Sequence, residues 1–255
     1  MEQFCKVTYI SNAGILLEYN DSKIMIDGFC NSILPIYKNP SDETKKLMIS
    51  GTNQFKNIDA LLFTHNHTDH FDAESTASFL NNSKKTFMLA PSKVVMEIKQ
   101  GFPNVESKRL INLEDGLGKT EDININEIEI QSISMLHDGK EHMDIRNLAY
   151  LVDIAGKRVL HVGDAKPTKE NYIHLDIIHK NIDLLIAPFP YIGLPTARQV
   201  IEKYIKPRKI VLVHFPYREM DTFGWINQTM KSYLKVKDTL PETVFFENLG
   251  EFINI

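Results

Sequence analysis

The sequence Thr64-His65-Asn66-His67-Thr68-Asp69-His70-Phe71-Asp72 holds three imidazoles and two carboxylates, although the whole chain has only nine histidines. It follows an apolar stretch at residues 59–63 that predicts a β-strand. Imidazole and carboxylate are ligands that Zn²⁺ prefers. In an extended loop, His65 and His67 point the same way and can bind one ion, whereas the adjacent Asp69 and His70 point apart. The loop therefore predicts a metal site and suggests two ions. A solvated polar loop is the weaker interpretation, because chance does not explain this clustering.

The composition favours a globular protein without a strong charge. The chain has 255 residues, of which 43% are hydrophobic and 24% charged, so we expect one domain over residues 1–255. The formal net charge of -4 argues against a general attraction to nucleic acid or anionic membranes. No apolar run resembles a signal peptide or a membrane span. Sparse cysteine use, limited to Cys5 and Cys30, is typical of reduced thiols, and we expect a cytoplasmic protein.

The N-terminal third predicts strands that lead into a loop and helices. Strands are expected at residues 6–10, 14–19 and 23–26, with a turn at residues 19–22. Residues 31–58 contain two prolines and a helix start at Ser41, which indicates an inserted loop and a short helix. Beyond the histidine loop, Asp72 is the expected N-cap of a helix through about Leu80. A strand at residues 86–89 and a helix that starts at Pro91 should follow.

The rest of the chain repeats this order of strands and helices. β-type alternation returns at residues 123–136 and 148–162. A strand, a helix and a strand are then expected at residues 182–187, 196–205 and 210–214. Two β-rich blocks that each lead into βα units predict an α/β fold, with two stacked mixed sheets and helices on their outer faces. This architecture is a four-layer αββα sandwich.

Three further candidate ligands stand where predicted strands end. They are His137, His214 and Asp164, the last reached through Gly163, whose missing Cβ allows the backbone to approach a crowded site. Layered α/β proteins often build their sites at strand ends. Each residue alone could be a polar strand end with ordinary hydrogen bonds. Together with the histidine loop, the three residues predict one shared site.

The order of these residues resembles the metallo-β-lactamase superfamily of binuclear metallohydrolases. The matching residues are His-x-His-x-Asp-His at 65–70, His137, Gly163-Asp164 and His214, and the resemblance spans about residues 6–254. Asp27 is similar to the early aspartate of the family, which orients the histidine loop. The resemblance implies the αββα sandwich and two ion sites that share Asp164 as a bridge, one held by His65, His67 and His137, the other by Asp69, His70 and His214.

Within the superfamily, the chain resembles the ascorbate-6-phosphate-lactonase-like branch of bacterial hydrolases. Residues 23–27, 183–188 and 206–214 carry this resemblance. Many members of the branch have Gly-His-Ser or Gly-His-Ala after the first strand, where this chain has Ser11-Asn12-Ala13. The inserted segment at residues 31–58 also differs from the leaner members.

The implied chemistry is hydrolysis. We expect two divalent metal ions. Zinc is the metal that the ligands favour, and manganese and iron are the alternatives. Such ions lower the pKa of a shared water toward about 7, so a bridging hydroxide can act as the nucleophile at neutral pH. Asp69 and Asp164 would be the catalytic carboxylates, and Asp69 can orient the hydroxide and later carry a proton. The expected reaction cleaves an ester, lactone, amide or phosphoester bond in a small molecule.

Five residues near the ligands are candidate substrate contacts, namely Lys140, His142, Arg146, Lys166 and Tyr191. Each could equally be an ordinary residue of a polar loop. His161 could support Asp164, although a histidine within a strand is more often a buried residue with satisfied hydrogen bonds. His174 and His179 lie far from the strand ends in sequence and are expected to be structural or exposed.

Three other functions stay open. A nuclease or other phosphodiesterase would use the same ions, but the acidic balance and the lack of a large inserted RNA-binding domain argue against it. Iron-based redox chemistry is known on this scaffold, and diiron reductase members have Glu where this chain has His67, which favours zinc. A regulatory metal-binding module without turnover is the third. The expected partner is a small molecule, and a homo-oligomer is an alternative to a monomer.

Overall fold

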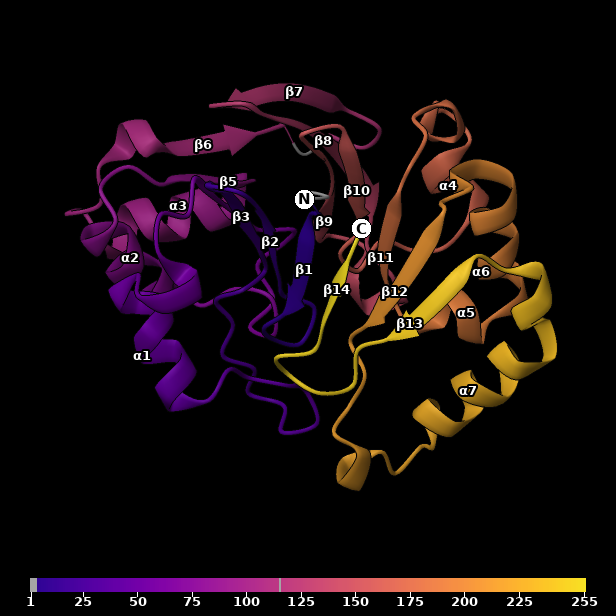
Figure 1. Cartoon of the computed structure of the whole chain (residues 1–255). Helices are drawn as coiled ribbons and strands as arrows, with labels where there is room; N and C mark the ends of the chain where they lie inside the picture. The colour runs from indigo at the N-terminus through magenta and orange to yellow at the C-terminus, as the bar shows by residue number, and fades with distance from the viewer. Residues whose placement is uncertain (1–3, 115) are drawn as a thin grey trace.

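Two seven-stranded sheets lie face to face in the computed structural model, and helices cover both outer faces (Figure 1). The structure describes residues 4–114 and 116–255. Helices α1 to α3 flank the N-terminal sheet, and α4 to α7 flank the C-terminal sheet. The predicted αββα sandwich is therefore confirmed.

The N-terminal sheet has the strand order β14-β1-β2-β3-β4-β5-β6. Strands β3 to β6 are parallel, and the other pairs are antiparallel. Its strands are β1 Lys6–Tyr9, β2 Ile15–Tyr19, β3 Ser22–Ile26, β4 Ala60–Leu62, β5 Phe87–Pro91, β6 Leu110–Leu113 and β14 Phe252–Asn254. Its helices are α1 Asp42–Ser50, α2 Ala73–Asn82 and α3 Ser92–Gly101, and 3₁₀ turns occur at Asn53–Phe55 and Ser107–Arg109.

The C-terminal sheet has the strand order β13-β12-β11-β10-β9-β8-β7. Its strands are β7 Thr120–Ile125, β8 Ile128–Leu136, β9 Arg146–Ile154, β10 Lys157–His161, β11 Leu184–Pro188, β12 Lys209–Val213 and β13 Glu242–Phe245. Its helices are α4 Lys169–Tyr172, α5 Pro190–Gly193, α6 Pro195–Val200 and α7 Trp225–Val236. A π-helical segment, Ile201–Ile205, extends α6, and 3₁₀ turns occur at Lys140–His142, Ile177–His179, Arg218–Met220 and Lys237–Thr239.

Strand alternation divides the core into three apolar layers. Ile15 and Leu17 point between the two sheets, whereas Leu16 points toward the helices on the outer face, as the period of two requires. Across the central layer, the hydroxyl of Tyr150 donates to the backbone carbonyl of Phe63 at 2.7 Å. This bond joins the two sheets next to the histidine loop.

The predicted caps form as expected. The Ser41 side chain accepts the backbone N–H of Thr44 at the start of α1, and the Asp72 carboxylate accepts the N–H of Ser75 at the start of α2. The sequence pattern did not predict α4, α5, β6, α7, β13 or β14. Strands β13 and β14 are mostly half-buried or exposed, so they lack the apolar alternation that reveals a strand.

The topology brings several strand ends to one edge of the sandwich. Strands β8 and β10 are both antiparallel to β9, and β11 and β12 are parallel to β10, so β8, β10 and β12 end on the same side. Strands β3 and β4 are parallel and end together in the other sheet. The residues after these strand ends form the site described below. Among the helices that the structure describes, none is long and apolar enough to cross a membrane.

Candidate metal centre

Asp27, at the end of β3, holds the histidine loop in place. Its buried carboxylate accepts the backbone N–H of Thr64 at 2.8 Å and the hydroxyl of Thr64 at 2.7 Å. The same carboxylate accepts a hydrogen bond from Nδ1 of His70 at 2.8 Å. In the neutral ring of His70 this bond places the proton on Nδ1, so Nε2 presents its lone pair to the site once the ring has lost its second proton.

His65 and His137 are oriented in the same way. Nδ1 of His65 lies 2.9 Å from the hydroxyl of Thr64, which already donates to Asp27 and so accepts here. Nδ1 of His137 donates to the backbone carbonyl of Asp138. These two bonds place the proton of each neutral ring on Nδ1. The Nε2 lone pairs of His65 and His137 are then available as ligands.

His65, His67 and His137 form the first cluster. Nε2 of His65 lies 3.1 Å from Nδ1 of His67 and 3.2 Å from Nε2 of His137. Zn–N bonds of 2.0–2.1 Å at tetrahedral angles place neighbouring nitrogens about 3.3 Å apart. Nε2 of His65 and Nε2 of His137 both present lone pairs, which repel each other unless a cation lies between them. The donor set therefore fits a zinc-like ion.

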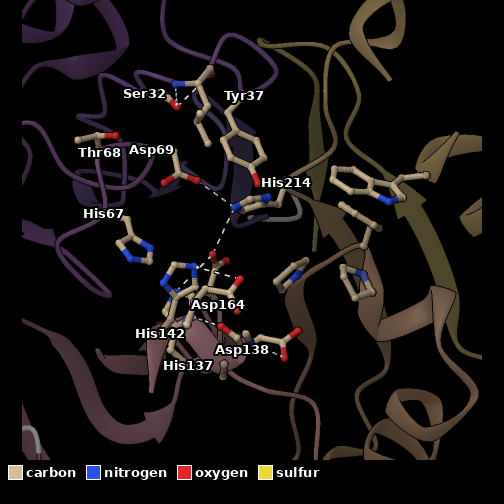
Figure 2. A pocket seen from close by; sticks show the side chains of 18 of the residues that line it. Ser32, Tyr37, His67, Thr68, Asp69, His137, Asp138, His142, Asp164 and His214 are labelled. Atoms are coloured by element: carbon tan, nitrogen blue, oxygen red, sulfur yellow. Dashed lines mark hydrogen bonds and ion pairs between the residues drawn. The ribbon is translucent and has the colours of Figure 1, made fainter. Parts of the chain in front are cut away.

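Asp69, His70, Asp164 and His214 form the second cluster, with ligand atoms within 4.8 Å of one another. Nε2 of His214 lies 3.2 Å from Oδ2 of Asp69 and 3.3 Å from Oδ2 of Asp164. The same oxygen of Asp164 lies 3.3 Å from Nε2 of His70 and 3.7 Å from Nε2 of His137. Asp164 therefore contacts ligand atoms of both clusters (Figure 2).

Three buried polar atoms of the second cluster make no hydrogen bond in the described part of the chain, although carboxylate oxygens lie within ion-pair distance of the two nitrogens among them. They are Nε2 of His70, Nε2 of His214 and Oδ1 of Asp164. A buried polar atom without a partner costs about 1–3 kcal/mol, so native proteins seldom keep one without a ligand or water. These atoms converge on one another, which fits a bound cation.

Burial and charge act differently on the two clusters. Burial, followed by the neighbouring His137 and His70, lowers the pKa of His67 to about 4, and burial also lowers the pKa of His65 and His137. In the second cluster, burial alone would lower the pKa of His214, but the Asp164 and Asp69 carboxylates outweigh it and raise that pKa to about 10. The same carboxylates raise the pKa of His70. At pH 7 and without bound ions, the histidines of the first cluster are therefore neutral, whereas the histidines of the second cluster carry an extra proton.

Asn12 is a site residue that the sequence pattern did not predict. Its Nδ2 donates to Oδ2 of Asp69 at 2.9 Å, and its backbone carbonyl accepts the N–H of His214 at 2.9 Å. His214 has a φ of 66°, a conformation that costs a residue with a Cβ about 1 kcal/mol or more. The Asn12 carbonyl thus helps to hold His214 in this strained geometry. Asn12 could have been found from its position directly after the first strand, where many members of the resembled branch have a histidine.

Gly163 lets the backbone of Asp164 approach the histidine loop. It has a φ of +55°, and an added Cβ would lie 2.4 Å from Oδ1 of Asn147 and 2.8 Å from Cβ of Thr64. Oδ1 of Asn147 also accepts the backbone N–H of Asp164 at 2.9 Å, so it cannot move away freely. The close approach expected from the sequence is present here.

Gly163→Ala is expected to lower the free energy of unfolding by about 3 kcal/mol, because the methyl group adds a clash to an unfavourable φ. Gly156→Ala is the matched control, since Gly156 has a φ of +79° with no atom within 4 Å of an added Cβ. Its cost should be only about 1 kcal/mol. Urea unfolding of both variants measures the difference, and equal losses would contradict the proposed crowding.

Both clusters open into one cavity of about 560 Å³ (Figure 2). His142 lines it, with its ring centroid 4.6 Å from that of His67 and 5.0 Å from that of His137. Tyr191 also lines it, but its hydroxyl donates to the carbonyl of Ala165 at 2.9 Å and contacts the hydroxyl of Tyr172. The other three candidate substrate contacts, Lys140, Arg146 and Lys166, do not line this cavity.

Three aromatic residues that were not among the predicted site residues also line the cavity, namely Tyr37, Phe189 and Trp225. Tyr37 lies beside His214, with ring centroids 4.7 Å apart in an edge-to-face arrangement (Figure 2). The remaining histidines do not line the cavity. His161 is buried, with Nε2 2.9 Å from the carbonyl of Ala13, and His174 and His179 are exposed outside the cavity.

Comparisons with known proteins agree with this architecture. The sequence profile of the β-lactamase superfamily domain matches residues 6–214. A protein from Pyrococcus furiosus that is named a metal-dependent hydrolase is 25% identical over 216 residues, which cover 82% of this chain and 84% of that protein.

Two solved structures show the same fold. The structure of a possible metal-dependent hydrolase from Veillonella parvula has a TM-score of 0.68 and 16% identity, with full coverage of both chains. A diiron β-hydroxylase from Streptomyces venezuelae has a TM-score of 0.66 and 13% identity, and the match covers 100% of this chain and 54% of the hydroxylase.

Proposed function

This chain belongs to the β-lactamase superfamily and is a metal-dependent hydrolase. We propose that it binds two divalent metal ions, with zinc as the preferred metal, and cleaves a bond in a small molecule. The bond would be an ester, lactone, amide or phosphoester. The position of Asp164 carries the proposal, because its Oδ2 lies within 3.3 Å of two ligand nitrogens in one cluster and 3.7 Å from one in the other. A carboxylate placed between two clusters is suited to bridge two cations.

The bound ions would activate a water and polarise the oxygen of the scissile bond. The remaining tasks fall to the protein. Asp164 and Asp69 keep low pKa values, because His214 and His70 outweigh the effect of burial. Oδ2 of Asp69 accepts the amide hydrogen of Asn12, so Oδ1 is the atom that can accept a proton and pass it to the leaving group.

Tyr37 is suited to donate a hydrogen bond inside the cavity. Burial, with Asp69 and Asp164 nearby, raises the pKa of Tyr37 to about 12, so its hydroxyl stays protonated at neutral pH. The ring packs against His214, which places it beside the second cluster. A neutral hydroxyl at this position can stabilise an oxygen that gains negative charge during hydrolysis.

Near neutral pH, ion binding should depend on pH at only one of the two clusters. The pKa of His214 is about 10 in the metal-free protein and 6.5 when unperturbed. The protonated ring thus stabilises the metal-free fold fully below pH 6.5, and this stabilisation is lost as the pH rises through about 10. An ion at the second cluster must displace these protons, so its affinity should rise with pH over the same interval.

The first cluster should bind its ion without proton release at pH 7, because the pKa of His67 is already about 4. Titration calorimetry of zinc in buffers with different ionisation enthalpies measures the released protons. The expected result is no proton for one ion and at least about one for the other. Equal proton release for both ions would contradict this assignment.

Two measurements test the proposed function. Protein stripped of metal and reconstituted with zinc, manganese or iron should bind two ions, and zinc should restore hydrolysis. A panel of lactone, ester, amide and phosphodiester substrates then identifies the bond. Activity that appears only with iron and a reductant would replace this proposal with the redox alternative. Binding of one ion per chain would overturn the binuclear site.

A further inference from the structure

A rigid aromatic wall lies beside the second cluster. The rings of Phe189 and Trp225 are stacked with centroids 5.7 Å apart, and Phe189 also stacks on Phe215 at 5.4 Å. Phe215 directly follows His214, so the wall continues from the last ligand of the cluster. Phe189 and Trp225 both line the cavity. Because each ring is packed against another, the wall offers a preformed apolar surface.

The loop at residues 32–37 adds a second apolar surface to the same cavity. Ile33 and Leu34 line the cavity, yet they are 82% and 53% exposed. The loop is tied down, since Nζ of Lys38 donates to the carbonyl of Pro216 at 2.9 Å and the N–H of Tyr217 donates to the carbonyl of Ile36 at 2.9 Å. Apolar side chains held in a cavity mouth gain free energy when a ligand covers them.

The charged groups away from the ligands are acidic. Asp138 and Glu141 line the cavity, and among the residues that the structure describes no lysine or arginine does so. Lys140, Arg146 and Lys166 lie nearby in sequence but outside the lining. A phosphate or carboxylate on the distal part of a substrate would meet like charges there without a basic partner.

We propose that the substrate is an uncharged ester, lactone or amide with an apolar substituent, aromatic or branched aliphatic, which lies against Phe189, Trp225, Ile33 and Leu34. This inference rests on the proposed function and narrows it. The reactive group faces the two clusters, and the substituent faces the apolar surfaces. A phosphorylated substrate does not fit the distal part of this cavity, which separates this chain from a phosphosugar lactonase and from a nuclease.

The first test compares two esters that differ chiefly in distal charge, and the uncatalysed rate of each is measured and subtracted, because the internal carboxylate speeds the spontaneous hydrolysis of the hemisuccinate. The pair is 4-nitrophenyl butyrate and 4-nitrophenyl hemisuccinate, which have acyl chains of equal length and end in a methyl group and a carboxylate. For the zinc-loaded protein, kcat/KM should be about tenfold or more higher for the butyrate, because Asp138 and Glu141 repel the carboxylate. Equal or faster hydrolysis of the hemisuccinate would overturn this inference and leave the proposed function intact.

Variants locate the preference in the cavity. Glu141→Lys should lower the ratio of kcat/KM for the butyrate to kcat/KM for the hemisuccinate about threefold or more. Glu127→Lys, at an exposed site outside the cavity, should leave this ratio unchanged.

Trp225→Ala should lower kcat/KM for the butyrate about tenfold. Phe252→Ala is its control, because Phe252 is 55% exposed and lies outside the cavity. Ile33→Ser tests the loop even if Trp225→Ala does not fold, with about a threefold loss expected.

A binding measurement decides the inference if neither ester is hydrolysed. Trp225 is the single tryptophan of the chain, so its fluorescence reports on the cavity. N-benzylacetamide should change this fluorescence saturably, and N-(4-sulfobenzyl)acetamide, whose sulfonate is a weak metal ligand, should bind about tenfold or more weakly. This result would support the apolar binding site even if the protein hydrolyses neither ester. Equal binding of the two amides, or no binding of either, would overturn the inference.

Discussion

Replacing Asp164 with asparagine should lower kcat/KM by about 10³-fold or more and reduce the bound metal below two ions per chain. The substitution keeps the volume of the side chain but removes the negative charge next to three ligand nitrogens. Oδ2 of Asp164 lies 3.3 Å from Nε2 of His70, 3.3 Å from Nε2 of His214 and 3.7 Å from Nε2 of His137. No other carboxylate in the described residues contacts both clusters in this way.

Elemental analysis and steady-state kinetics on the most reactive panel substrate measure these effects. Asp176→Asn is the matched control, because the Asp176 side chain is 72% exposed and pairs with the exposed His179. That variant should keep full activity and metal content. If Asp164→Asn retained two ions and wild-type turnover, Asp164 could not be the bridging carboxylate, and the binuclear proposal would have to be abandoned.

Replacing Asp27 with alanine should lower the free energy of unfolding of the metal-free protein by about 4 kcal/mol. The carboxylate is fully buried and serves three donors, namely the N–H and hydroxyl of Thr64 and Nδ1 of His70. Its removal leaves these donors unpaired in the core and frees the His70 ring to rotate. Zinc affinity at the second cluster should also fall, by about 10- to 100-fold, as is typical when the partner of a ligating histidine is lost.

Asp59→Ala is the control for this prediction. Asp59 also accepts two hydrogen bonds next to β3 and β4, from the N–H of Lys23 at 2.8 Å and from Asn126 at 2.6 Å, but it lies at the opposite end of these strands and is half-buried. Asp59→Ala should lower the free energy of unfolding by only about 1 kcal/mol and leave the zinc affinity unchanged. Urea unfolding and competition with a zinc chelator measure both quantities. Similar losses for the two variants would show that Asp27 has no special link to the metal centre.

Local signals explain which elements could be predicted. Ser41 and Asp72 cap helices through bonds to residues three positions later, so the whole interaction is contained in a short segment of sequence. Most strands that line the three apolar layers alternate or are continuously apolar, and their own pattern predicted them; β6, which contributes Leu110 and Leu113, is the exception. Strands β13 and β14 lie at the edges of their sheets with mostly half-buried or exposed side chains, so their pairing depends on β12 and β1 rather than on their own pattern.

The sequence by itself determined the αββα fold, the candidate ligands and their order, because the histidine loop is one short segment and the other candidate ligands lie within three residues of the ends of apolar strands. Only the tertiary structure decided how these residues share their contacts. It placed Asp164 between two clusters, put Asn12 against Asp69, and excluded Lys140, Arg146 and Lys166 from the cavity lining. It also brought Trp225 and Ile33 into one cavity. These contacts join residues far apart in the chain, and their geometry follows from strand pairing and packing, which no local pattern encodes.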